Sequence, residues 1–378
     1  MKPAIDLFKY VNKTRLEQFK YFLREMNARG LADHYGKPYV TDDEPMSSKI
    51  MYFQPILLAP SDRREVAKHI VGLPNSVLPV EDKVLNICLT YFYGPTNIYT
   101  YISGKTNPAE AHIHFDRVHN DPDYVTSLRE NVAYARLHGH KMWTTYELHT
   151  SVQTAGRNYC RVKYNDPTRK AGDLDVVEWL AGLRYDGTVD RILKAKTLQD
   201  GYDALTSVHG IGPYFGGNSI LMIANLAEVE YTHDEPFCAP GGGAIKTINY
   251  LFEDFFKAGH KMKPEKLIAW VAEHQEQLLE GVKIPVEFHN MDVSHGKLLK
   301  HDLARYTCNA LEVGMCQFSV YCKFTEDPEA MKRRPNPPAI DLSPFAARER
   351  GEPMAPEKAG KAVKVVEPTT RVCLLDFD

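Results

Sequence analysis

The sequence predicts a mainly α-helical protein, and three observations support that fold class. Apolar residues within the first 29 positions recur at steps of three and four, as they do on one face of a helix. From Asp173 to position 323 the same period returns in one segment after another. The chain of 378 residues is 43% apolar and 25% charged, which fits a globular protein with a sizeable core and excludes a fibrous or wholly disordered chain.

The individual elements are predicted from this helical period of apolar residues and from the glycines and prolines that interrupt it. Residues 1–29 are expected to form one helix that stops at Gly30, and residues 31–60, which are rich in proline, to form an irregular crossing. The apolar run Ile98–Ile102 is a candidate strand. Other helices are expected over residues 63–71, 80–93, 124–137, 174–184, 188–193, 197–208, 214–227, 243–257, 264–280 and 296–323.

Four regions are expected along the chain. Residues 1–96 form an N-terminal helical part, and residues 97–170 form a partly irregular insertion without an assigned role. Residues 171–324 form a second helical part that carries the glycine-containing elements described below. Residues 325–378 are rich in proline and charge and show almost no apolar period, so we expect a flexible tail.

Composition also excludes several kinds of protein. No run of about 18 apolar residues occurs, and the N-terminus is amphipathic with charges throughout. We therefore expect a cytoplasmic protein without a membrane partner. Seven cysteines without a CxxC pair indicate reduced thiols. The net charge of −3 predicts no general affinity for polyanions, so any contact with nucleic acid must come from local features.

His112 and His114 form an H-x-H pattern with acids nearby. On a strand both imidazoles would face the same side, as a metal site requires, whereas a solvated polar face is the simpler interpretation. We assign no metal and no cofactor to the chain.

The segment Leu198–Ala227 predicts two helices joined by a short glycine-containing turn, which is a helix-hairpin-helix. Glycines let the backbone approach a partner closely, and the amides at the start of the second helix favour an anion such as a DNA phosphate. We therefore expect DNA to be bound by His209, Gly210, Gly212 and Tyr214. Alternatively, the turn serves helix packing alone.

A second glycine-rich element, Pro240–Lys246, runs into an apolar helix. Consecutive glycines ahead of a helix start form a nest of amides suited to phosphate or pyrophosphate, and a lysine adds positive charge. The element is not a Walker A loop, because Ile245 replaces the required glycine and no strand precedes it. The expected anion ligands are Gly241, Gly242, Gly243 and Lys246. The alternative is a loop that lets two helices pack closely.

These residues resemble the helix-hairpin-helix DNA glycosylase superfamily, in which a catalytic aspartate follows the hairpin. The resemblance implies a catalytic role for Asp234 or for the adjacent Glu235. Tyr214 stands where bifunctional members carry a lyase lysine, so a Schiff-base lyase reaction is not expected. Without the hairpin upstream, the two acids would be interpreted as helix-capping or loop acids.

More specifically, the chain resembles the α-glutamyl/putrescinyl-thymine pyrophosphorylase-like proteins, the amino acid:DNA transferases of thymine hypermodification in viruses such as bacteriophages. The segment Gly36–Asp43, with Thr41 and Asp43, is similar to the family's N-terminal Pro-Trp-Thr-x-Asp signature, although Tyr39 replaces tryptophan. Pro240–Ala244 is similar to the family's glycine-rich element.

The third part of the resemblance lies near the end of the helical region. Asn309–Phe318, which contains Cys316, is similar to the family's final Leu-Cys-Glu-Phe helix. Gln317 replaces the glutamate of that motif, so no acid–base role follows for position 317.

The resemblance implies a transferase that replaces the (pyro)phosphate of an activated 5-hydroxymethyluracil in double-stranded DNA with a free amino acid or polyamine, in an infected host cell. Such a site needs a flipped base, a cradle for the departing phosphates, a base for the incoming ammonium and exclusion of water. Attack on the base by Cys238 or Cys316 is a conceivable first step. The alternatives are a monofunctional DNA glycosylase and a module that only binds duplex DNA.

Overall fold

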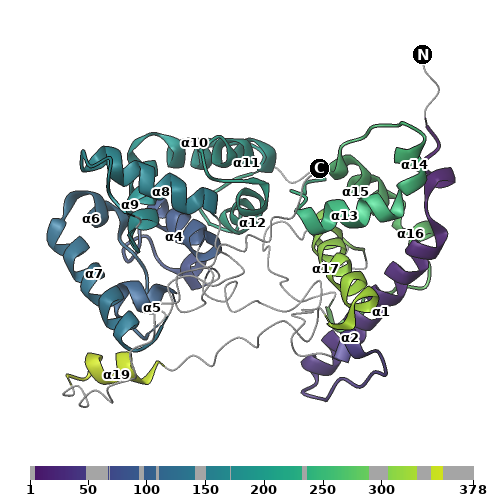
Figure 1. Cartoon of the computed structure of the whole chain (residues 1–378), viewed down its shortest axis with the longest axis horizontal. Coiled ribbons are helices and arrows are strands. Elements are labelled where there is room, and N and C mark those ends of the chain that lie inside the picture. The colour runs from purple at the N-terminus through teal and green to yellow at the C-terminus, as the bar shows by residue number, and fades with distance from the viewer. Residues whose placement is uncertain are drawn as a thin grey trace.

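The computed structural model describes residues 5–47, 67, 69–92, 98–107, 110–140, 150–170, 172–231, 236–288, 305–329 and 342–351. The helices form two lobes that lie side by side (Figure 1). No β-strand occurs within these ranges, so the prediction of a mainly α fold is confirmed. None of the helices described has the length and hydrophobicity needed to cross a membrane.

The first lobe, at the left of Figure 1, contains α4 to α12 together with α19. Buried apolar residues between positions 67 and 231, together with Phe345, form its core. Buried residues from α5, α6 and α7 therefore share a core with buried residues of α9 to α12. The helices are α4 Val80–Phe92, α5 Ile98–Ser103, α6 Phe115–Asn120, α7 Pro122–Leu137, α8 Thr150–Lys163, α9 Asp175–Tyr185, α10 Thr188–Lys194, α11 Leu198–Thr206, α12 Pro213–Ile223 and α19 Ser343–Glu349.

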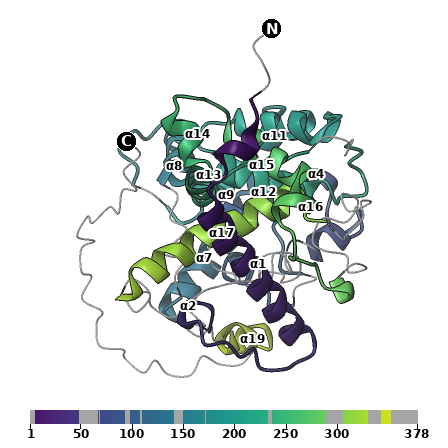
Figure 2. The same cartoon turned by 90° about the vertical axis from the view of Figure 1, so that its right-hand side faces the viewer.

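The second lobe combines the N-terminal segment with residues from the last third of the chain, which together form a separate core. Helices α1 and α17 cross one another in Figure 2, and the rings of Phe19 and Phe22 in α1 lie 5.2 and 5.6 Å from the ring of Phe318 in α17. Both helices also contact α13. The elements are η1 Leu7–Tyr10, α1 Lys13–His34, α2 Glu44–Ser47, α13 Gly242–Leu251, α14 Glu253–Lys257, α15 Pro264–Glu273, α16 Gln275–Leu278, η2 Val286–Phe288 and α17 Cys308–Glu326.

Most helices expected from clear amphipathic period are present, but several local expectations are wrong. Residues 1–29 do not form one helix, because the short helix η1 Leu7–Tyr10 ends before α1 begins at Lys13. Residues 305–307, within the helix expected over 296–323, are not helical. Helix α1 does not stop at Gly30; it continues to His34, because Leu31 packs against the second core and outweighs the cost of about 1 kcal/mol for an interior glycine. The segment Ile98–Ile102 forms α5 instead of a strand. All five of its residues are buried, and a helix buried on every side shows no amphipathic period.

Part of the segment expected to be a flexible tail is ordered. Residues 343–349 form α19, whose Phe345 is fully buried against the first lobe. The Phe345 ring lies 5.8 Å from the ring of Tyr101 and 5.3 Å from that of Tyr134. One aromatic anchor in a sequence otherwise rich in charge and proline is too weak a signal for composition to reveal.

Candidate functional site

Two helices, α11 and α12, joined by residues 207–212, occupy the segment in which the hairpin is expected. Thr197 Oγ1 caps α11 by accepting a hydrogen bond of 3.0 Å from the amide of Asp200. Gly210 has a φ of +100°, and a Cβ placed there would lie 2.7 Å from the Cβ of Ala155 in α8. Glycine is therefore required at this position, both by the backbone and by the approach to α8. Ile211 is buried and holds the turn against the first core.

The turn also presents an open side. His209 and Tyr214 are exposed, and nothing lies within 4 Å of a Cβ placed at Gly212. Helix α12 begins at Pro213, so the positive end of its dipole lies at the turn. His209, Gly210 and Gly212 therefore lie in the turn and Tyr214 lies in the first turn of α12, while the open side of the turn is at Gly212.

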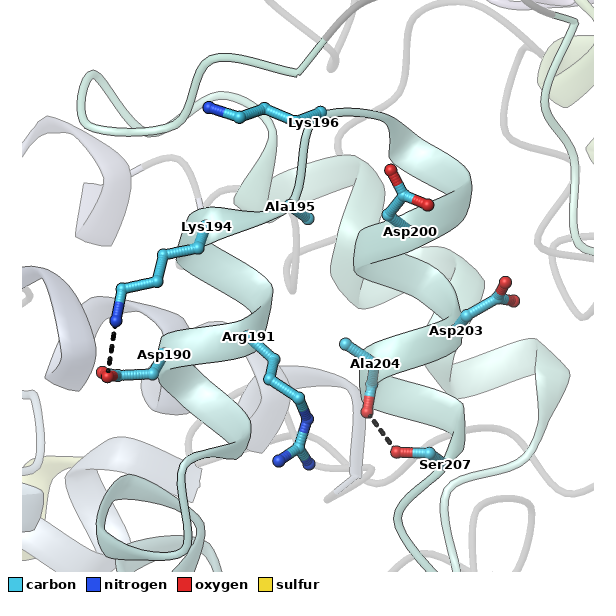
Figure 3. A pocket seen from close by; sticks show the side chains of 9 residues that line it. All are labelled: Asp190, Arg191, Lys194, Ala195, Lys196, Asp200, Asp203, Ala204 and Ser207. Atoms are coloured by element: carbon cyan, nitrogen blue, oxygen red, sulfur yellow. Dashed lines mark hydrogen bonds and ion pairs between the residues drawn. The ribbon is translucent and has the colours of Figure 1, made fainter.

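A surface hollow of about 660 Å³ lies near the hairpin, between α10 and α11 (Figure 3). Three cations and three acids line it: Arg191, Lys194, Lys196, Asp190, Asp200 and Asp203. Lys194 already forms an ion pair of 3.0 Å with Asp190. Because these charges balance, the hollow offers no cationic track for DNA.

Residues 236–241 lead the chain from the hairpin into the second lobe. Ala239 packs closely against α12. A Cβ placed at Gly217 in α12 would lie 2.3 Å from the Cβ of Ala239. The ring of Phe237 meets the ring of Tyr202 in α11 edge-on at 5.6 Å. These contacts hold the hairpin next to the start of α13. The expected catalytic acids, Asp234 and Glu235, lie outside the described residues, so their role stays a prediction.

The three consecutive glycines lie at the start of α13 and face α17. The amide of Gly241 donates a hydrogen bond of 2.8 Å to Glu312 Oε1, and the Cys316 thiol lies against the backbone of Gly243 and Ala244. A Cβ placed at Gly243 would lie 2.8 Å from the Cys316 sulfur and 2.9 Å from the Cys316 carbonyl oxygen. Gly243 therefore allows α13 and α17 to pack closely. We call Gly241, Gly242 and Gly243 together with Glu312 and Cys316 the glycine cup.

The outer side of the cup remains accessible. Gly242 and Lys246 are exposed, and Gly242 is the first residue of α13. A Cβ placed at Gly241 would lie 3.5 Å from Tyr214 Cδ2 and 3.6 Å from Glu312 Oε1, so the hairpin tyrosine and the buried carboxyl meet at this glycine. An anion at the cup would contact the exposed Gly242 and Lys246, because Gly241 donates to Glu312 and Gly243 packs against Cys316.

Glu312 is a candidate functional residue to which the sequence assigned no role. Its side chain lies in α17 with 8% of its surface exposed, and burial raises its pKa to about 7, although the hydrogen bond from the Gly241 amide opposes the rise. Among the residues described, no lysine, arginine or histidine forms an ion pair with it. A carboxyl group that titrates near neutral pH can both hold and release a proton. The signal available in the sequence was one acid within the apolar stretch Ala310–Met315.

The thiols near the cup are poor nucleophiles. Burial, with a smaller contribution from Glu312, raises the pKa of Cys316 to about 11, and burial also raises the pKa of Cys238. Both groups are therefore protonated near neutral pH, when only the thiolate attacks carbon efficiently. A cysteine-initiated reaction has no support in this geometry.

The N-terminal motif residues connect elements of the second lobe. Asp43 accepts hydrogen bonds from the hydroxyl groups of Tyr21 in α1 (3.2 Å) and Tyr321 in α17 (2.7 Å). It also accepts from the Met46 amide (3.1 Å), and its own amide donates to Thr41 Oγ1 (3.2 Å). Asp43 therefore links α1, α2 and α17, and α17 is the helix that carries Glu312 and Cys316.

The H-x-H pattern lies in the loop before α6, not on a strand. The rings of His112 and His114 are 4.9 Å apart, and burial together with the charge of Arg117 lowers the pKa of His114. Within the ranges described, no three His, Cys, Asp or Glu side chains gather as metal ligands would.

Comparison with known proteins identifies a family. The family described as 5-hmdU DNA kinase, helical domain, matches residues 67–326, more than half of the chain. The matched range contains the first lobe up to α12, the hairpin, the glycine cup and the whole of α17. No curated protein and no solved structure matches. The family's enzymes act on 5-hydroxymethyldeoxyuridine (5-hmdU) in DNA, which agrees with the expectation of a modified thymine as target. The chain therefore belongs to the 5-hmdU DNA kinase helical-domain family.

Proposed function

We propose that this protein replaces the (pyro)phosphate on the 5-methylene of an activated 5-hydroxymethyluracil in DNA with an amino acid or a polyamine. Membership of the family supports DNA containing this base as the substrate. The observation that carries the finer proposal is the meeting of three features at the start of α13. These features are the hairpin residue Tyr214, the glycine-rich helix start and the buried carboxyl of Glu312.

The proposed reaction divides its tasks among these features. The hairpin holds the DNA strand while the target base is flipped out of the duplex. The amide of Gly242 and the ammonium of Lys246 bind the phosphate, and Asp234 or Glu235 accepts the proton of the incoming ammonium. The amine nitrogen then bonds to the methylene carbon, and the carbon–oxygen bond breaks, so that the (pyro)phosphate leaves with the electron pair.

Phosphorylation of 5-hydroxymethyluracil itself is the second candidate, and the family's description favours it. A kinase needs a site for a nucleoside triphosphate. The segment Gly241–Thr247 lacks the glycine that precedes the lysine in a Walker A loop, and its first amide is bound by Glu312. Transfer of an amine needs no such loop.

The test is to incubate the protein with duplex DNA that carries 5-phosphomethyluracil or 5-pyrophosphomethyluracil, together with a mixture of amino acids and polyamines. A parallel reaction contains 5-hydroxymethyluracil DNA and ATP. Mass analysis of the nucleosides decides the outcome. An amino-linked thymidine supports the proposal, whereas a phosphorylated nucleoside indicates a kinase and a free base indicates a glycosylase. Unchanged DNA in every reaction would contradict all three enzymatic readings.

A further inference from the structure

The structure points to a specific chemical task for Glu312. We propose that Glu312 donates a proton to the bridging oxygen of the departing (pyro)phosphate. This inference rests on the proposed transfer reaction, and it assigns to Glu312 the role opposite to that expected of Asp234 or Glu235. One reaction would then use two kinds of carboxyl group, an acid for the leaving group and a base for the amine.

The position of Glu312 suits a proton donor. Its Oε1 accepts the Gly241 amide at 2.8 Å, which fixes the carboxyl beside the start of α13 and leaves the second oxygen to carry the proton. The exposed Gly242 is the next residue along the chain. A phosphate bound at the outer side of the cup would therefore lie beside a carboxyl that is 8% exposed.

The electrostatic surroundings favour the neutral carboxyl before the reaction. Cys316 on α17 and Cys238 on the crossing segment interact electrostatically with Glu312, and the ring of Tyr214 on α12 meets it at Gly241. Burial keeps both thiols protonated near neutral pH, and Lys246 is exposed to solvent. Arrival of an anionic phosphate would raise the proton affinity of Glu312 further, since a nearby like charge disfavours ionisation.

After the transfer, the same surroundings stabilise the product. The carboxylate left on Glu312 keeps the hydrogen bond from the Gly241 amide and lies at the positive end of α13, a helix of 10 residues. The proton balance closes, because the incoming ammonium releases one proton as the carbon–nitrogen bond forms. Glu312 takes up one proton from solvent before the next turnover.

The experiment compares two leaving groups in single-turnover reactions of the full chain with an amine. Pyrophosphate is a weaker base than phosphate, so it departs with less help from an acid. Glu312→Gln should therefore slow reaction of 5-phosphomethyluracil DNA by about 100-fold or more, within the range for general acids, and reaction of 5-pyrophosphomethyluracil DNA much less. Equal slowing on both DNAs would overturn the proposal, because a structural defect does not distinguish the leaving group.

Two controls sharpen the result. Glu326→Gln changes the same residue type near the other end of α17, where Glu326 is half-exposed and pairs with Arg15, and it should leave both rates unchanged. Glu312→Asp keeps an acid at the site and should restore part of the phosphate rate if the variant folds. If the wild type forms no amino-linked nucleoside from either DNA, the transfer reaction fails and this inference fails with it. If only the leaving-group difference is absent, the assignment of Glu312 alone fails.

Discussion

Two buried carboxyl groups, one in each lobe, have different hydrogen-bond partners and opposite pKa shifts. In the first lobe, Glu178 is 1% exposed and lies 3.0 Å from the ammonium of Lys163. Burial favours its neutral form, yet hydrogen bonds from Tyr164 and Lys163 outweigh burial and lower its pKa. In the second lobe, Glu312 is almost as deeply buried, its hydrogen bond comes from the amide of Gly241 instead of from a cation, and its pKa rises to about 7.

This difference separates a carboxylate that stabilises the fold from a carboxyl group that can change its protonation state during a reaction. A buried carboxylate with a cation keeps its charge, and its main effect is to fix the helices that carry the pair. A buried carboxyl without a cation can change its protonation near neutral pH, as a general acid must. Asp82 in the first lobe is an intermediate case: it pairs with Arg184, yet burial raises its pKa to about 6.

The largest expected effect comes from removing a cation in the first lobe. Arg184→Met leaves Asp82, which is 1% exposed, without its partner, and loss of one partner of a buried pair costs about 3–5 kcal/mol. The deficit should be smaller at pH 5 than at pH 8, because Asp82 can then take up a proton. Urea unfolding at the two pH values measures both effects. Lys194→Met breaks an exposed pair and should change stability by less than about 0.5 kcal/mol; similar losses in the two variants would contradict the comparison.

Glu312→Gln should change how stability depends on pH. The folded pKa of about 7 lies above the ordinary value of 4.5, so between these values the folded state binds more protons than the unfolded state. The contribution of Glu312 is therefore fully present below pH 4.5 and is lost as the pH rises through 7. Relative to the variant, the wild type should lose up to about 3 kcal/mol over this range. Parallel stability curves from urea unfolding at pH 5, 6, 7 and 8 would show that Glu312 does not titrate in this way.

Gly243→Ala tests whether the glycine cup also allows α13 and α17 to pack closely. Its Cβ would lie 2.8 Å from the sulfur and 2.9 Å from the backbone oxygen of Cys316, so α13 and α17 must move apart. We expect a loss of about 1–3 kcal/mol in the free energy of unfolding. Gly212→Ala is the matched control, because nothing lies within 4 Å of its Cβ. A neutral Gly243→Ala would mean that the cup does not depend on close helix contact.

Gly212→Ala should have the smallest effect, and the effect should be on DNA binding. The added methyl group projects into open space at the turn, so the fold is unaffected while the approach of a phosphate is hindered. We expect affinity for duplex DNA to fall about 5-fold, or about 1 kcal/mol, at fixed salt concentration. A titration monitored by fluorescence anisotropy measures this change, and unchanged affinity would remove the turn from the DNA contact.

The sequence predicted those features that depend on local pattern. Helices with a clear amphipathic period, such as α7, and the turn at Gly210 follow from residues close together in the chain. Helix α5 was missed because burial on all sides removes the period. The role proposed for Glu312 cannot be predicted from neighbouring residues in the sequence. It depends on the position of Gly241, which is 71 residues away along the chain.

The most direct measurement is the pKa of Glu312 itself. A pH titration of the side-chain carboxyl carbon by ¹³C NMR, with the signal assigned by its absence in Glu312→Gln, gives this value without assuming any reaction. The structure predicts a pKa of about 7. A value near the ordinary 4.5 would contradict the view that this carboxyl is held neutral and ready to donate a proton.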